Sequence, residues 1–128
     1  MSVPARRSVT GGGNVYTSTK LTASDSTTKV TLVTPTSGKK IRVISIHCSS
    51  SSATASVFEA YFHTGANIDA TANNAVFSTY LDTDIQPADG MVWPNGVGPL
   101  GAVDEVVSMR TGTNISAAGR FTIVYGEE

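Results

Sequence analysis

Residues 39–62 read KKIRVISIHCSSSSATASVFEAYF and place four consecutive serines between two apolar runs. Apolar and polar side chains alternate on both sides of the serines, which is the pattern of half-buried β-strands. Serine favours turns because its hydroxyl hydrogen-bonds the neighbouring backbone. The stretch therefore predicts two long strands joined by a hairpin turn, with the serines at the turn.

The only cysteine lies in this stretch, next to a histidine. A cysteine nucleophile needs a depressed pKa and a base within hydrogen-bond reach. Neighbouring side chains of a strand point to opposite faces, so His47 cannot be the base for Cys48. His63, at the end of the second strand, would lie far from the thiol in a hairpin. We therefore expect Cys48 to be a small core residue beside Ile44 and Ile46, and the chain not to be an enzyme.

The same alternation continues along the chain and predicts seven or eight strands without a helix. They are expected at 14–21, 27–35, 39–49, 54–65, 75–83, 91–93, 103–111 and 120–126. Many short strands with turn residues between them are typical of an antiparallel β-sandwich. The long connection at 84–102 favours a jelly roll or another Greek key. An immunoglobulin-type domain is the near alternative, but its Cys…Trp…Cys spacing is absent.

The first residues differ from the rest. Residues 1–13 show no periodicity, contain Pro4 and end in three glycines, which predicts an extended N-terminal arm. Residues 14–128 are then expected to form one β-sandwich domain. No apolar run reaches the ~20 residues of a membrane helix, and no apolar stretch follows the basic residues of the arm, so we expect neither a membrane segment nor a secretory signal. With a single cysteine, synthesis in a reducing cytoplasm is the expectation.

Charge is distributed unevenly along the chain. Residues 1–42 hold seven lysines and arginines against one aspartate, whereas residues 43–128 hold two arginines against nine acids. Such asymmetry indicates partner contacts, for example a basic arm of one copy on an acidic surface of another. Chance clustering of solvated charges is the alternative. The predicted contact residues are Arg6, Arg7, Tyr16, Lys39, Lys40 and Arg42.

Two loops carry weaker candidate sites. Asp82, Asp84 and Asp89 resemble a carboxylate cluster for a hard cation, although aspartates are common in turns without any metal. Trp93 is a candidate ligand contact, since sugar-binding sandwiches often use an exposed aromatic platform. The favoured interpretation is that Trp93 closes one end of the sandwich. We expect no metal and no cofactor.

Nucleic-acid and nucleotide binding are not expected. The glycines at 11–13 precede no strand–helix unit, so they do not form a phosphate-binding loop. The dibasic pairs at 6–7 and 39–40 lack the interleaved aromatic residues of a nucleic-acid surface.

Several short motifs resemble those of a known class of proteins. These are a GKKIRV strand after a TPxSG turn, a Ser/Ala-rich hairpin, an aromatic F-x-A-Y-F-x-T-G strand and a terminal G-x-F-T-I-x-Y strand. Over residues 25–126 they resemble small β-sandwich virion proteins of tailed bacteriophages. The most similar type is the jelly-roll capsid decoration (cement) protein.

The resemblance implies a structural role. Proteins of this type form trimers on the outer capsid surface and reach neighbouring subunits with an extended N-terminal arm. The implied partners are further copies of the chain and the major capsid protein of a phage head, without a small-molecule substrate. The alternative is a host- or glycan-binding module on a tail or fibre; head and tail locations both stay open at this stage.

Overall fold

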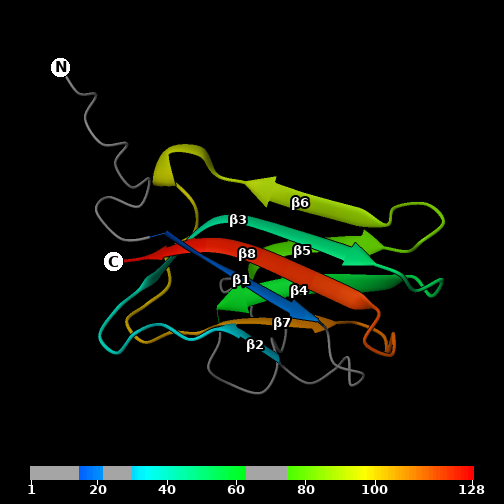
Figure 1. Ribbon diagram of the computed structural model, residues 1–128, viewed down its shortest axis with the longest axis horizontal. Helices are drawn as coiled ribbons and strands as arrows, with labels where there is room; N and C mark the ends of the chain where they lie inside the picture. The colour runs from blue at the N-terminus through cyan, green and yellow to red at the C-terminus, as the bar shows by residue number, and fades with distance from the viewer. Residues whose placement is uncertain (1–14, 22–29, 63–74) are drawn as a thin grey trace.

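The computed structural model describes residues 15–21, 30–62 and 75–128, and Figure 1 shows them as two stacked antiparallel sheets. The eight strands are β1 (Val15–Leu21), β2 (Val30–Val33), β3 (Ile41–Ser50), β4 (Ser56–Phe62), β5 (Ala75–Leu81), β6 (Ala88–Val92), β7 (Val107–Thr111) and β8 (Gly119–Glu127). In these ranges the only helical element is a 3₁₀ turn, η2 (Pro94–Gly96). The predicted all-β sandwich is confirmed.

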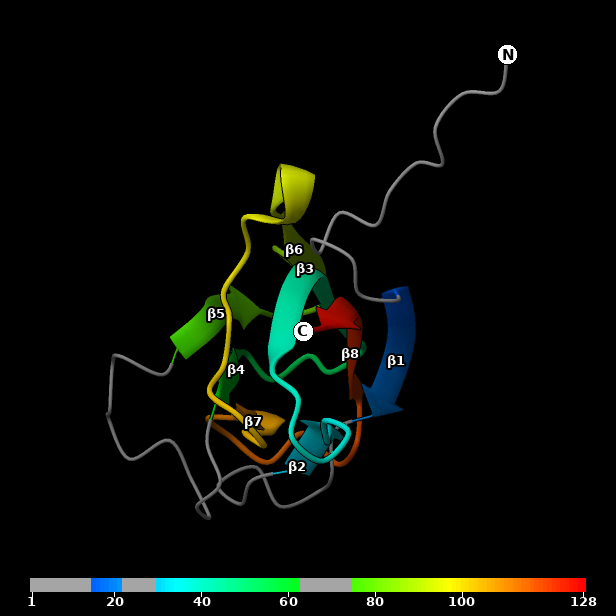
Figure 2. The same ribbon diagram turned by 90° about the vertical axis from the view of Figure 1, so that its left-hand side faces the viewer.

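The order of the strands identifies the sandwich as a jelly roll. Sheet A has the order β1-β8-β3-β6, and sheet B has the order β2-β7-β4-β5. The first strand thus pairs with the last, the second with the seventh, the third with the sixth and the fourth with the fifth. One antiparallel ribbon of this kind, folded over and wrapped into two sheets, gives the two Greek keys of a jelly roll. Figure 2 shows the two sheets from one end.

The predicted hairpin at 39–62 is wrong. β3 belongs to sheet A and β4 to sheet B, so the segment after the serine run crosses from one sheet to the other. Alternation of apolar residues identifies the inward side of each strand but not its neighbour, and both strands do turn an apolar side inward. Phe58 of β4 and Phe121 of β8 meet across the core, with ring centroids 5.5 Å apart.

A β-bulge in β3 decides which of its side chains enter the core. The register with β8 shifts between Val43 and Ser45, so that the alternation changes phase within the strand. Val43 is buried before the shift, and Ile46 and Cys48 are buried after it. This explains why the apolar side of the sequence pattern changes halfway along 39–49. Ile46 lies beside Cys48 as predicted, whereas Ile44 sits at the bulge, only partly buried and outside the core cluster.

The core between the sheets is aliphatic and aromatic. Fully buried side chains come from both sheets and include Ile41, Val43, Ile46, Phe58, Leu81, Val107, Met109, Phe121 and Ile123. Burying one such side chain stabilises the fold by about 1.5–3 kcal/mol.

The boundaries of several strands differ from the sequence prediction, and those of β6 and β7 need a structural explanation. β6 is longer than 91–93 and begins at Ala88. β7 begins at Val107, because Asp104 adopts a positive φ of 64° and forms a turn where a strand was expected. The Asp104 carboxylate accepts a hydrogen bond of 2.6 Å from the Gly38 N–H, and this contact fixes the turn.

The segment after η2 completes the edge of β3. β6 pairs with β3 only over 45–49. Further along the same edge, the Val43 N–H donates to the Pro99 carbonyl and the Gly101 N–H donates to the Ile41 carbonyl, each at 2.9 Å. Gly98 lies so close to this edge that a Cβ atom there would collide with the Val43 carbonyl.

Gly98→Ala is expected to lower the free energy of unfolding by about 2–3 kcal/mol, since the added methyl group meets backbone that cannot move aside. Gly112→Ala is the matched control, because a Cβ atom there meets its nearest neighbour, the Val57 Cβ, at an ordinary 3.5 Å. Urea unfolding followed by tryptophan fluorescence measures both. Equal stability of the two variants would contradict the close approach at Gly98.

Candidate functional site

The structure separates His47 from Cys48 as predicted. His47 is exposed on the outer face of sheet A, whereas Cys48 is only 3% exposed and belongs to the core. Burial, and secondarily the Asp89 carboxylate, raise the pKa of the Cys48 thiol from 9.0 to about 12. A nucleophilic cysteine requires a shift in the opposite direction. His63 lies outside the described residues.

Two aspartates of the candidate cation site, Asp82 and Asp89, accept hydrogen bonds from backbone and hydroxyl groups. Asp82 Oδ1 accepts hydrogen bonds from the N–H groups of Asp84 (2.8 Å) and Ile85 (2.6 Å), which is an aspartate-stabilised turn. Asp89 accepts from the Thr79 hydroxyl at 2.6 Å and from the Gly90 N–H at 2.8 Å. These two bonds, the first being the stronger influence, lower the pKa of Asp89. Within 15–21, 30–62 and 75–128, no group of three His, Cys, Asp or Glu side chains could hold a metal ion.

The basic end of β3 is neutralised by the C-terminus. Arg42 forms a 2.9 Å ion pair with Glu128 and donates to the Gly98 carbonyl at 2.9 Å. The Lys40 and Glu128 backbones exchange two hydrogen bonds of 2.9 Å. Lys39 is exposed in the preceding turn. Arg42 thus ties the end of the chain to β3, and of this basic cluster only Lys39 presents an exposed side chain.

Of the remaining predicted contact residues, only Tyr16 lies within the described ranges. Tyr16 on β1 is 40% exposed, and its ring lies 5.6 Å from that of Tyr125 on β8. Arg6 and Arg7 lie outside the described residues. Trp93 is half-buried and packs against the core, in agreement with a side chain that closes one end of the sandwich.

The outer face of sheet A contains a groove that the sequence did not reveal. Beyond the bulge, alternate side chains of β3 face outward between β6 and β8. These residues and their partners on β6 and β8 form two neighbouring rows across the sheet. One row is Gly90–His47–Thr122, and the other is Ala88–Ser49–Arg120. They line a hollow of about 350 Å³, and a second hollow of about 430 Å³ continues toward the loop before β8. We name this surface the His47–Arg120 groove.

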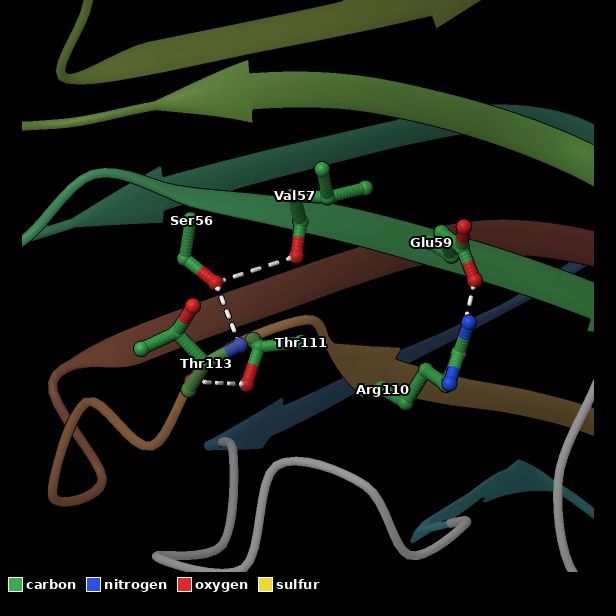
Figure 3. Close-up of polar contacts among 6 residues, drawn as sticks. All are labelled: Ser56, Val57, Glu59, Arg110, Thr111 and Thr113. Atoms are coloured by element: carbon green, nitrogen blue, oxygen red, sulfur yellow. Dashed lines mark hydrogen bonds and ion pairs between the residues drawn. The ribbon is translucent and has the colours of Figure 1, made fainter.

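The polar groups of sheet B are matched to one another, as Figure 3 shows. Arg110 of β7 forms a 2.7 Å ion pair with Glu59 of β4. The buried Ser56 hydroxyl accepts a hydrogen bond from the Thr113 N–H at 3.0 Å, and the Thr111 hydroxyl donates to the Thr113 carbonyl at 2.9 Å. These contacts join β4 to β7 and to the loop that follows it. On sheet A, by contrast, no ion pair to Arg120 is found among the described residues.

A second unusual surface lies in the segment from Met91 to Val103, which includes η2. The segment contains no charged residue. Among the described residues it carries five of the eight exposed large apolar side chains: Met91, Val92, Val97, Leu100 and Val103. Figure 2 shows the chain running from η2, beside sheet A, to β7 in sheet B across one end of the sandwich. We name this surface the neutral end segment.

Comparison of the sequence with known protein families and with curated proteins finds no match. In the described ranges, no helix has the length and apolarity that crossing a membrane requires. The function must therefore be argued from the two surfaces.

We expect Cys48 to resist alkylation by iodoacetamide in the native protein. A rise in pKa from 9.0 to about 12 lowers the thiolate fraction at neutral pH roughly a thousand-fold. The thiol should react readily once urea unfolds the chain. Ser49→Cys places an exposed thiol one residue further along β3 and is the control that must react in the native state. Rapid modification of native Cys48, read by mass spectrometry, would contradict its place in the core.

Proposed function

We propose that the chain is a structural virion protein that decorates and stabilises a bacteriophage capsid as an oligomer of β-sandwiches. The observation that carries this proposal is the neutral end segment. Five exposed large apolar side chains in one segment without charges favour contact with another protein. The resemblance of residues 25–126 to capsid decoration proteins supplies the context.

The composition of the segment favours a second copy of the same chain as its partner. A surface without charges meets its own copy without like-charge repulsion, and it offers no charge for a partner of opposite sign to recognise. Val97 is 67% exposed and Val103 is 52% exposed, so both would lose much water contact on association.

The neighbouring strand edge supports the same conclusion. β6 is an edge strand that pairs only with β3 among the described strands. Exposed strand edges favour unwanted pairing with other chains, and proteins generally cover them or keep them short. A closed ring of subunits would cover the segment beside this edge. Three subunits is the number that the resemblance implies.

The N-terminal arm is proposed as the tether to the major capsid protein. Its two arginines precede a glycine run, so the arm carries positive charge without side chains that favour a fold. Many copies on one capsid lattice would add avidity to a weak individual contact.

Val97→Asp together with Val103→Asp should convert the oligomer to a monomer. Two carboxylates would have to be buried without partners, which should weaken association at least about a hundred-fold. Light scattering during gel filtration should give three times the 13.3 kDa chain mass for the wild type and one chain mass for the variant.

Ile85→Asp is the matched control for that experiment. Ile85 is 86% exposed in the loop between β5 and β6, outside the neutral end segment, so the same change there should leave the oligomer intact. A wild-type monomer at micromolar concentration, or an unaffected double variant, would refute self-association through the segment.

Deletion of residues 1–13 should leave the sandwich folded and abolish binding to capsids. Cosedimentation with purified particles that lack the protein measures binding, and circular dichroism checks the fold. Arg6→Gln with Arg7→Gln should weaken binding most at low salt concentration, because added salt screens the arginine charges of the wild type and so reduces the difference. Undiminished binding of the deleted chain would rule out the tether while leaving the neutral end segment untouched.

A further inference from the structure

The His47–Arg120 groove has a size suited to a small ligand. Its two adjoining hollows, of about 350 and 430 Å³, share Ser49 and Arg120. Ligand sites generally occupy 300–1,000 Å³ and combine an apolar floor with a few placed polar groups. Because Arg120 lines both hollows, a ligand that occupied the two together would have its middle beside this arginine.

Arg120 and Asp89 are the two charged residues of the groove lining. Two other described arginines, Arg42 and Arg110, form ion pairs with glutamates, whereas none is found for Arg120 in the described ranges. Asp89 is the acidic residue of the lining, and its carboxylate is hydrogen-bonded by Thr79 and Gly90. A planar guanidinium without an ion pair is a good bidentate donor to a carboxylate or phosphate.

The floor of the first hollow carries small side chains, and the His47 imidazole ring lies over Gly90. Gly90 lies opposite His47, and a Cβ atom at this position would collide with the imidazole ring and with the Ile46 carbonyl. Ala88 in the next row adds only a methyl group. This floor and the face of the imidazole form a shallow apolar wall, which suits the C–H face of a pyranose ring.

The second hollow is polar. It is lined by Ser49, Ser51 and the turn before β8. In that turn Ser116 and Ala117 adopt positive φ angles of 52° and 63°, and the Ala118 N–H donates to the Ile115 carbonyl at 3.0 Å. The Ser51 hydroxyl donates to the Ala118 carbonyl at 3.2 Å and can still accept from a sugar hydroxyl, whereas the exposed Ser49 hydroxyl can donate or accept.

We propose that the His47–Arg120 groove binds a saccharide that carries an anionic group. The guanidinium of Arg120 pairs with the carboxylate or phosphate. The apolar wall receives the ring, and Ser49 and Ser51 bind its hydroxyls. This site shares no residue with the neutral end segment, and ligand binding does not require the assembly role.

Chemical-shift mapping of the full chain by two-dimensional ¹H–¹⁵N NMR tests the proposal. The probes are D-glucuronate, glucose 6-phosphate, glucose and the tripeptide Gly-Glu-Gly, each at millimolar concentration. Saturable shifts at His47, Ser49 and Arg120 with either acidic sugar, and much weaker ones with glucose, are expected. The affinities for D-glucuronate and for glucose 6-phosphate show whether the groove prefers a carboxylate or a phosphate. The proposal would be overturned if neither acidic sugar caused shifts, or if Gly-Glu-Gly bound with the same affinity as the acidic sugars.

Three variants make the test specific. Arg120→Gln should weaken binding of the acidic sugar about ten-fold or more, because a charge-assisted hydrogen bond is lost. Ala88→Phe should block the first hollow without changing any charge. Lys39→Gln removes one positive charge from an exposed turn outside the groove and should leave the affinity unchanged. Equal affinities of Arg120→Gln, Ala88→Phe and the wild type would overturn the proposal.

Discussion

The pairing of β3 with β8 is the interaction on which the rest of the structure depends. It joins residues 41–50 to residues 119–127, so the last strand of the chain lies in the middle of sheet A. Its bulge determines which side chains of β3 enter the core and which face outward. Had the register continued without that shift, the Ile46 and Cys48 positions would face solvent and His47 would face the core. The core and the groove are therefore two consequences of one backbone irregularity.

The pairing of β3 with β8 also explains why the basic residues at the start of β3 contact the C-terminal residue. Because β8 ends beside that point, Glu128 reaches both the backbone of Lys40 and the guanidinium of Arg42. In the sequence Arg42 and Glu128 are 86 residues apart, and the charge asymmetry alone indicates partner contacts for Arg42. In the fold these two side chains form an ion pair within the same chain.

The strands themselves could be predicted, because alternation with a period of two requires only local information. Cys48 and Ile46 were assigned correctly to an inward face for this reason. The hairpin between β3 and β4 was wrong because a strand's neighbour depends on contacts far along the chain, which no local pattern encodes. The expected strand at 103–106 failed for a similar reason: the Asp104 turn is held by Gly38, which lies in another loop. The groove could not be predicted at all, since its residues come from 47–49, 88–90 and 120–122 and carry no motif.

The two surfaces are close neighbours on the same sheet edge. Val92 belongs to the neutral end segment and lies opposite Ser45, two residues along β3 from His47. Two residues of an antiparallel strand span about 7 Å. A subunit packed on Val92 would therefore stand at the rim of the His47–Arg120 groove and would form one of its walls. If copies associate through the neutral end segment, assembly should restrict the groove to ligands that enter from the Arg120 side, where the polar hollow and its serine hydroxyls lie. An acidic saccharide bound there would present its anionic group to Arg120 first, so assembly and ligand entry are compatible on one small sheet.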